Sequence, residues 1–438
     1  MKIDLDQFVA RRKALMSNMP ADSIAIIPSA QMKQRNNDVE YPFRQDSSFY
    51  YLTGFNEPDA MLLLIPGRAS GETVLFCRER DKLMEIWNGY RSGPDGAVND
   101  FAFDEAHAIG EIDDVLPALL NGMSRIYYSI GQDEELDQQI RHWLNLIRGK
   151  VRQGAVAPTE LVMLDHLLNE MRLIKGTEEQ DLMRRAGEIS AQGHVKAMEL
   201  CKPGLMEYQL EAEILHHFAM QGARQPAYST IVGGGSNACI LHYIENDQPL
   251  ADGDLVLIDA GCELEHYAGD ITRTFPVNGQ FSEPQAALYS LVLKAQKACI
   301  DLAKPGVLWD AVHDCSVEVL TKGLIELGLL KESLEEAITA GSYRDFYMHR
   351  IGHWLGMDVH DVGDYKVENQ WRPLEPGMVM TIEPGLYVAA DNMDVDPCWR
   401  GIGIRIEDDI LITESGCEVL TAAVPKEIDE IEALMASA

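Results

Sequence analysis

The sequence predicts an α+β protein: an N-terminal mixed α/β domain, residues 1–172, followed by a pseudo-symmetric domain, residues 173–438. Two observations predict this arrangement. Short apolar, strand-like runs alternate with helical segments over the first 150 or so residues. Further on, the order helix pair, strands, helix pair, strands occurs, which is what a duplicated α+β unit would give. The length of 438 residues is enough for two or three domains with a large buried core.

The first domain is expected to begin with an amphipathic helix over residues 4–17 and to hold a further helix over residues 136–147. Short runs of aliphatic and β-branched residues predict its strands. The predicted strands are residues 23–28, 60–66, 73–77 and 125–130.

The second domain opens on Thr177-Glu-Glu-Gln180, which matches a capping box with Thr177 as the N-cap and Gln180 reaching back. The sequence predicts a long helix from there towards Cys201, where Lys202-Pro-Gly204 would stop it. The other predicted helices are residues 207–221, 284–303, 309–327 and a tail within 425–438, and the predicted strands are residues 228–232, 255–259, 265–276, 379–388 and 402–413.

Two segments of this domain repeat each other, and each contains a carboxylate after an apolar run. Residues 250–261, LADGDLVLIDAG, align with residues 374–385, LEPGMVMTIEPG. A leucine, two glycines and an isoleucine match, and Asp259 falls on Glu383. The full-length repeat is weak, but the strand with its terminal carboxylate is visible in both copies.

A further carboxylate follows each copy, Asp270 in YAGDITRTF and Glu407 in GIRIEDDILI. We expect both to lie in the middle of strands. A charged carboxylate beside a buried strand is costly unless something compensates it, and four such groups would repel one another without cations. The sequence therefore predicts a divalent-cation site, against the alternative that all four acids sit at exposed strand ends.

Three of the twelve histidines, His349, His353 and His360, occur within twelve positions between the two acidic segments. One imidazole added to four carboxylates makes an oxygen-rich set of ligands, which suits manganese, with cobalt or zinc possible. His242 follows a glycine run that lacks the pattern of a phosphate-binding loop, so we reject nucleotide binding. Arg405, two residues before Glu407, shares a strand face with it and could hold that carboxylate ionised.

Composition excludes several partners. The net charge of −33 argues against nucleic acid and anionic membranes. No apolar run approaches the length needed to cross a bilayer, and the first residues lack a signal core. The eight scattered cysteines contain no Cys-x-x-Cys pair, so we expect free thiols in a reducing compartment and a cytoplasmic protein.

These motifs resemble those of the pita-bread metallopeptidases, and within them the aminopeptidase P (Xaa-Pro aminopeptidase) family. The matching blocks in the second domain are DGDLVLIDAG, YAGDITRTFPV, HWLGMDVHDVG, EPG and GIGIRIEDD, and EYPFRQDSSFYYLTGFNEP matches in the first domain. The resemblance spans nearly the whole chain. It implies a pita-bread catalytic domain and an N-terminal domain concerned with oligomerisation and substrate access.

The resemblance also implies two divalent metal ions, held by Asp259, Asp270, His353, Glu383 and Glu407. The catalytic residues that it implies are Glu383, His242, His349, His360 and Arg405. Trp87 matches a residue that relatives send into a neighbouring subunit's site, which implies a homo-oligomer, a tetramer in relatives. One departure is Arg350, since close relatives often have a small residue after the first histidine.

The expected function is hydrolysis of the bond between an N-terminal residue and a following proline, by hydroxide bridging two metal ions. The nearest alternative is a prolidase, which cuts only Xaa-Pro dipeptides. A methionine aminopeptidase would leave the large N-terminal domain unexplained. A metal-independent creatinase-like enzyme or a non-catalytic pita-bread module that binds peptides should lack the five acidic and histidine ligands.

Overall fold

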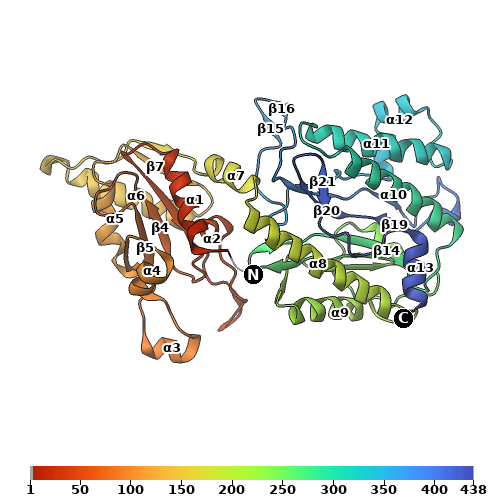
Figure 1. The fold of residues 1–438 in the computed structure, drawn as a ribbon, viewed down its shortest axis with the longest axis horizontal. Helices are drawn as coiled ribbons and strands as arrows, with labels where there is room; N and C mark the ends of the chain where they lie inside the picture. The colour runs from red at the N-terminus through yellow and green to blue at the C-terminus, as the bar shows by residue number, and fades with distance from the viewer. Residues whose placement is uncertain (1–2, 438) are drawn as a thin grey trace. The chain divides into compact units, whose positions relative to one another are not determined.

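The computed structural model describes residues 3–437, and the chain divides into two compact units between Met171 and Arg172 (Figure 1). Each unit has its own sheet and its own buried core. Among the described residues, no helix combines the length and apolarity that crossing a membrane would take.

The first unit is built on a six-stranded mixed sheet in the order β6-β5-β4-β1-β7-β8. Its aliphatic strands pack against α5 and α6, and Trp143 is fully buried among them. The strands are β1 (Ser23–Pro28), β4 (Met61–Leu64), β5 (Thr73–Cys77), β6 (Glu105–Ala108), β7 (Arg125–Tyr127) and β8 (Glu160–Val162), with a hairpin of β2 (Gln34–Asn36) and β3 (Val39–Glu40). The helices are α1 (Leu5–Ser17), α2 (Ser47–Thr53), α3 (Lys82–Asn88), α4 (Gly93–Phe101), α5 (Ile112–Leu120) and α6 (Glu134–Gly149), and α7 (Asp165–Leu173) spans the boundary between the units.

The second unit holds two helix pairs, α8 with α9 and α10 with α11, each packed side by side (Figure 1). Its two central sheets have the orders β10-β11-β14 and β17-β20-β21. The helices are α8 (Thr177–Leu200), α9 (Glu207–Met220), α10 (Glu283–Leu302), α11 (Trp309–Glu326), α12 (Leu334–Ala340) and α13 (Ile428–Ala436). The strands are β9 (Gln225–Pro226), β10 (Ile231–Gly234), β11 (Leu255–Asp259), β12 (Cys262–Leu264), β13 (Tyr267–Ala268), β14 (Thr272–Pro276), β15 (Lys366–Val367), β16 (Gln370–Trp371), β17 (Val379–Ile382), β18 (Gly385–Val388), β19 (Ile402–Arg405), β20 (Asp408–Ile412) and β21 (Cys417–Val419).

The repeat seen in the sequence has a matching backbone arrangement. Leu250 and Leu374 are both buried at the starts of their segments. The carbonyl of Leu250 accepts from the N–H of Gly204 at 2.9 Å, and that of Leu374 accepts from the N–H of Gly306 at 2.8 Å. Each glycine follows a Lys-Pro pair at the end of the first helix of its half. The two halves therefore start their central strands from the same local structure, as a duplicated unit requires.

The predicted capping box was wrong by one residue. Gly176 is the N-cap of α8, and its N–H donates to the carboxylate of Glu179 at 2.9 Å. Thr177 already lies inside the helix, and the side chain of Gln180 donates to the carbonyl of Lys175 instead. Glu179 takes the role assigned to Gln180 because it lies three residues after the true N-cap.

Several predicted strands of the second unit are shorter than expected. The strand predicted over 228–232 begins only at Ile231, because its partner β11 ends at Asp259, opposite Ile231. The run 379–388 is broken at Pro384, which has no N–H to donate to a ladder. The run 402–413 is broken into β19, which pairs with β18, and β20, which pairs with β17.

The expectation that Asp270 and Glu407 lie in the middle of strands was also wrong. Asp270 precedes β14, and its N–H donates to the carboxylate of Asp409 at 2.9 Å. Glu407 lies in the gap between β19 and β20, where its N–H donates to the carbonyl of Thr272 at 3.1 Å. Both acids sit at breaks in the ladders, and these breaks free their side chains to turn towards the centre of the unit.

Candidate metal centre and active site

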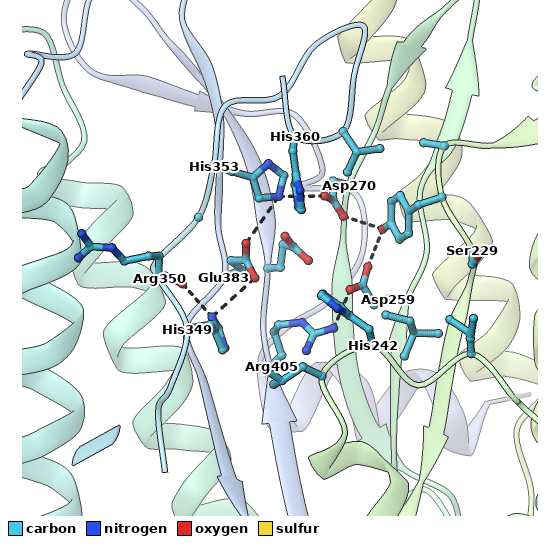
Figure 2. A pocket seen from close by; sticks show the side chains of 18 residues that line it. Ser229, His242, Asp259, Asp270, His349, Arg350, His353, His360, Glu383 and Arg405 are labelled. Atoms are coloured by element: carbon cyan, nitrogen blue, oxygen red, sulfur yellow. Dashed lines mark hydrogen bonds and ion pairs between the residues drawn. The ribbon is translucent and has the colours of Figure 1, made fainter. Parts of the chain in front are cut away.

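A pocket of about 710 Å³ in the second unit gathers nearly all the candidate site residues (Figure 2). Its apolar wall includes Ile231, Leu241, Ile244 and Val359. The candidates that line it are Asp259, Asp270, His353, Glu383, Glu407, His242, His349, His360 and Arg405. Trp87 is not among its lining residues; it lies on α3 of the first unit, with 83% of its surface exposed.

The four carboxylates come from equivalent places in the two halves. Asp259 ends β11, and Asp270 precedes β14, the antiparallel partner of β11. Glu383 follows β17, and Glu407 precedes β20, the antiparallel partner of β17. Each half therefore delivers one acid from the end of one strand and one from the approach to its neighbour.

His353 reaches the same point from an irregular segment that runs alongside β17. The N–H of Thr381 donates to the carbonyl of His353 at 3.0 Å, and the N–H of Glu383 donates to the carbonyl of Ile351 at 2.8 Å. These bonds set the segment in register with β17. As a result His353 Nε2 lies 3.4 Å from Asp270 Oδ2 and 3.7 Å from Glu383 Oε1.

The hydrogen bond on the other side of the ring determines what Nε2 can do. His353 Nδ1 lies 2.9 Å from the carbonyl oxygen of Trp354, which can only accept, so Nδ1 carries the proton. In the neutral ring, Nε2 then presents a lone pair to the oxygens of Asp270 and Glu383. Only a cation or a second proton can bridge atoms that are all acceptors. This orientation of Nε2, with Nδ1 bonded to a carbonyl, is the usual arrangement of a metal-binding histidine.

The pKa shifts of the clustered acids and His353 also indicate that this site favours a positive charge. Burial and then the neighbouring acids raise the pKa of Glu407 well above its ordinary value, and burial raises the pKa of Glu383 to about 7. Burial would raise the pKa of Asp270 too, but the hydrogen bond and charge of His353 outweigh it and lower that pKa. Burial opposes a charge on His353, yet Asp270 and Glu383 raise its pKa to about 9. The raised pKa values of His353 and Glu383 favour protonation of the cluster. A divalent ion at the same place would provide a larger positive charge.

The donor set fits a divalent metal. One ligand atom each from Asp270, His353 and Glu407 lies within 4.8 Å of the others. Asp259 and Glu383 line the same pocket with further carboxylate oxygens. An oxygen-rich set with one imidazole suits hard or borderline divalent ions better than a structural zinc site, which would use cysteine and histidine.

Tyr228, which the sequence did not mark as a site residue, lies between two of the acids. Its hydroxyl oxygen is 2.5 Å from Asp259 Oδ1 and 2.6 Å from Asp270 Oδ1. A phenol has one proton to donate, so it cannot donate to both carboxylates at once. The contact therefore orients both acids and leaves one of them in need of a further proton or cation.

Arg405 joins several groups of the site. Its guanidinium donates to Asp259 Oδ2 at 2.6 Å, to the hydroxyl of Thr272 at 3.1 Å and to the hydroxyl of Tyr387 at 3.1 Å. The hydroxyl of Thr272 in turn donates to Glu407 Oε2 at 2.6 Å. The sequence placed Arg405 beside Glu407, but the structure pairs it directly with Asp259 and reaches Glu407 only through Thr272.

His349 is held through the same network. Its Nδ1 donates to the carbonyl of Arg350 at 2.8 Å, so its Nε2 accepts from the hydroxyl of Tyr387 at 2.9 Å. Burial, and then the charge of Arg405, lower the pKa of His349 to about 3. His349 is therefore neutral. Tyr387 was missed in the sequence because it lies in an ordinary apolar run, Gly-Leu-Tyr-Val, with nothing to mark its hydroxyl.

The other two histidines face the pocket differently. His360 packs edge-on against His353, with ring centroids 4.3 Å apart, and burial lowers its pKa. His242 lies on the opposite side, in the segment between β10 and β11 (Figure 2). The guanidinium of Arg350 points away from the acidic cluster in Figure 2 and lies 5.4 Å from the centre of the Trp371 ring. Arg350 therefore lines the pocket with its guanidinium directed away from the candidate ligands.

Comparisons with known proteins agree with this geometry. Residues 181–414 match the model of metallopeptidase family M24, and residues 8–127 match that of the aminopeptidase P N-terminal domain. The chain is 49% identical to the Xaa-Pro aminopeptidase of Escherichia coli strain K12, covering 100% of this chain and 99% of the relative.

Two solved structures are closely similar. A Pseudomonas aeruginosa aminopeptidase is 56% identical, with a TM-score of 0.99, over 100% of this chain and 99% of its own. Zinc-substituted E. coli aminopeptidase P in complex with product is 48% identical, with a TM-score of 0.97 and the same coverage. The resemblance and the fold class predicted from the sequence are confirmed. The chain belongs to metallopeptidase family M24 and carries the N-terminal domain of aminopeptidase P.

Proposed function

We propose that the chain is a metal-dependent aminopeptidase that hydrolyses the bond between an N-terminal residue and a following proline. The observation that carries this proposal is the convergence of four carboxylates and His353 Nε2 on one pocket of a family M24 fold. Full-length similarity to proteins named Xaa-Pro aminopeptidase supports the choice of substrate.

Divalent ions bound by this cluster would lower the pKa of a coordinated water and polarise the scissile carbonyl. Glu383 is assigned the proton transfer: it would accept the water's proton at its carboxylate and pass it to the leaving nitrogen. Its position supports this role, because the hydroxyl of Thr381 donates to Oε1 at 3.3 Å and Oε2 lies on the side of His349.

The histidines and Arg405 would act on the substrate and on the ligands. His360 and His242 are assigned to stabilise the developing oxyanion by donating from their ring nitrogens. His349, neutral and held by Tyr387, would contact the substrate. Arg405 would hold Asp259 and, through Thr272, Glu407 in place.

The carboxylates of the cluster also explain why the enzyme would prefer the amino-terminal end of a peptide substrate. A protonated amino terminus is attracted to a buried group of carboxylates, which favours cleavage after the first residue. The leaving group is a proline nitrogen, which has no N–H in the intact bond, so recognition cannot use one. The apolar wall of Ile231, Leu241, Ile244 and Val359 suits a pyrrolidine ring.

Several finer assignments belong to the proposal. Two ions bind per chain, with Mn²⁺ preferred over Co²⁺ or Zn²⁺. The protein is a cytoplasmic homo-oligomer, and we suggest a tetramer. Trp87, on the exposed α3, serves a neighbouring subunit's site. The first unit as a whole serves oligomerisation and substrate access, and Asp259, Asp270, His353, Glu383 and Glu407 are the metal ligands.

The alternatives are less well supported. A prolidase shares the ligands but is not favoured by the full-length relatives, which are named aminopeptidases. A non-catalytic peptide-binding module would have no need for the five acidic and histidine side chains at one pocket.

The test is metal reconstitution of the metal-free protein, followed by comparison of Arg-Pro-Pro with Gly-Pro as substrates. We expect release of arginine from the tripeptide, with Mn²⁺ giving the highest rate. Activity confined to the dipeptide would identify a prolidase, and no hydrolysis with any divalent ion would favour the binding module.

A further inference from the structure

A buried carboxylate outside the metal centre, Glu207, organises the segment between β10 and β11. Glu207 is the first residue of α9 and is fully buried. Its Oε1 accepts from the N–H of Gly234 at 2.8 Å and from the amide of Asn237 at 3.0 Å. Its Oε2 accepts from the hydroxyl of Tyr243 at 2.8 Å and from the N–H of Gln248 at 2.9 Å. Each oxygen therefore serves two donors.

These four donors span the pocket wall, which we define as residues 234–248. The wall carries His242 next to Tyr243, and Leu241 and Ile244 also line the pocket. Among residues 3–437, no hydrogen bond to the imidazole of His242 is found, so the position of that ring depends on the backbone that carries it and on packing. Tyr243 directly follows His242, and its hydroxyl donates to Glu207. This is the side-chain hydrogen bond nearest to His242 along the chain.

A second residue, Asn246, fixes the far end of the wall to β10 and also donates to the carboxylate of Glu211 at 2.9 Å. Asn246 accepts from the N–H of Val232 at 3.0 Å and donates to the carbonyl of Thr230 at 2.9 Å. Its backbone has a φ of 49°, a left-handed conformation that asparagine tolerates better than most residues. Asn246 thus anchors the edge of the wall, while Glu207 lies under its middle.

The chemistry of the contacts requires a carboxylate at this place. All four partners donate, and an ionised carboxylate is a pure acceptor with room for four hydrogen bonds. Glutamine has the same size but would turn an NH₂ group towards two of these donors. A buried donor left without an acceptor is costly, so the wall would shift.

The ring of Tyr243 extends this support to the other side of the site. It packs in a small buried cluster with Ile231, Leu257 and Tyr387. The hydroxyl of Tyr387 is the one that holds His349. Glu207 is therefore connected, through one tyrosine, to both histidine-bearing walls of the pocket.

We infer that Glu207 is a positioning residue for the peptidase reaction: it acts through Tyr243 to hold His242 where the reacting carbonyl needs it. This inference rests on the proposed function and adds to it a residue that lies outside the metal ligands and the pocket lining.

A double-mutant cycle between Glu207→Gln and His242→Ala tests the inference with the metal-loaded enzyme and an Xaa-Pro peptide. In the wild-type background, Glu207→Gln is expected to lower kcat by about 10- to 100-fold, the cost of misplacing a catalytic group slightly. KM and bound metal should stay near wild-type values. In the His242→Ala background the same change should cost less than about threefold, because its effect passes through His242. Equal losses in both backgrounds, or no loss in either, overturn the inference.

A second variant, Tyr243→Phe, and a control variant, Glu213→Gln, complete the test. Tyr243→Phe removes only the hydroxyl and should give a smaller loss of kcat that also disappears in the His242→Ala background. Glu213→Gln, an isosteric change on the same helix, forms the matched control and should leave kcat unchanged.

Amide hydrogen exchange gives an answer that does not depend on turnover. Glu207→Gln should speed exchange by about tenfold or more at either Gly234 or Gln248, because these N–H groups bond different oxygens of Glu207 and glutamine keeps only one of the two. Unchanged exchange at both would overturn the positioning role. A wild-type enzyme that fails to cleave Xaa-Pro peptides would instead refute the proposed function.

Discussion

His353 Nε2 lies 3.4 Å from Asp270 Oδ2, while the opposite ring nitrogen of His353 donates its proton to a backbone carbonyl. When the ring is neutral, a lone pair on Nε2 faces a carboxylate oxygen, and only a proton or a cation can bridge the two. The contacts of Tyr228 and Arg405 with the neighbouring carboxylates are consistent with a bound cation at this place.

Replacing Tyr228 by phenylalanine should weaken metal binding. The hydroxyl lies within 2.6 Å of both Asp259 and Asp270, so its loss removes one of the contacts that orient each acid. Groups that orient metal ligands typically contribute 10- to 100-fold in affinity, and we expect a loss of that order. Isothermal titration with Mn²⁺ measures it, and Tyr208→Phe, a half-exposed tyrosine, is the control. An unchanged affinity would mean that the phenol plays no part in orienting the acids.

Arg405→Lys should lower kcat/KM by about 10- to 100-fold and also weaken Mn²⁺ binding, because Arg405 orients Asp259 and, through Thr272, Glu407. The guanidinium contacts Asp259, Thr272 and Tyr387 at once, and an ammonium on a flexible stem cannot reproduce that fork. Steady-state kinetics together with metal analysis would check both parts. Wild-type turnover in the lysine variant would show that Arg405 provides charge without geometry.

Asp361→Asn should destabilise the second unit by about 3–5 kcal/mol, the usual cost of removing one partner from a buried ion pair. Asp361 is buried between Arg172 at 2.6 Å and Lys175 at 2.9 Å, and the side chain of Lys175 is only 1% exposed. Urea unfolding measures the change, with the exposed Asp364→Asn as control. A difference below about 1 kcal/mol would mean that Lys175 finds another partner.

The pH dependence of stability should include a contribution from His194. Burial lowers the pKa of this fully buried histidine to about 4, from an ordinary value near 6.5. The unfolded chain therefore binds a proton between these values that the folded chain does not. Stability is lost as pH falls from about 6.5 to about 4, by a total of about 3 kcal/mol.

His194→Gln removes that titration, so its free energy of unfolding should fall less than that of the wild type between pH 7 and pH 4.5. The exposed His142→Asn variant should keep the wild-type slope. If the glutamine variant also keeps it, the buried imidazole is not the group that titrates.

The sequence predicted the long helices of the second unit, though not the short α12, and the gathering of acids, because both depend on local patterns. α8, α9, α10 and α11 each begin or end within about two residues of the predicted bounds. The duplicated segments could be aligned because the buried strands of both halves need the same apolar residues.

What the sequence did not predict depends on contacts between distant segments. The strand break at Glu407 exists because the chain changes partner from β18 to β17, and no residue near it signals that change. Tyr228 and Tyr387 were missed because a tyrosine in a predicted strand looks structural until the partners of its hydroxyl are known, and those partners lie far away in the sequence. By contrast, the helix predicted over residues 4–17 and the strand predicted over residues 73–77 are present, because the local propensity and the pattern of buried residues favour the same structure there.

The central claim is that Asp259, Asp270, His353, Glu383 and Glu407 together bind divalent metal. Titration of metal-free protein with Mn²⁺, followed by electron paramagnetic resonance, tests it most directly. The account predicts two ions per chain with a spin-coupled signal, and loss of that signal in both Asp270→Asn and His353→Ala. A wild-type protein that binds no Mn²⁺, Co²⁺ or Zn²⁺, or variants that keep the coupled signal, would contradict it.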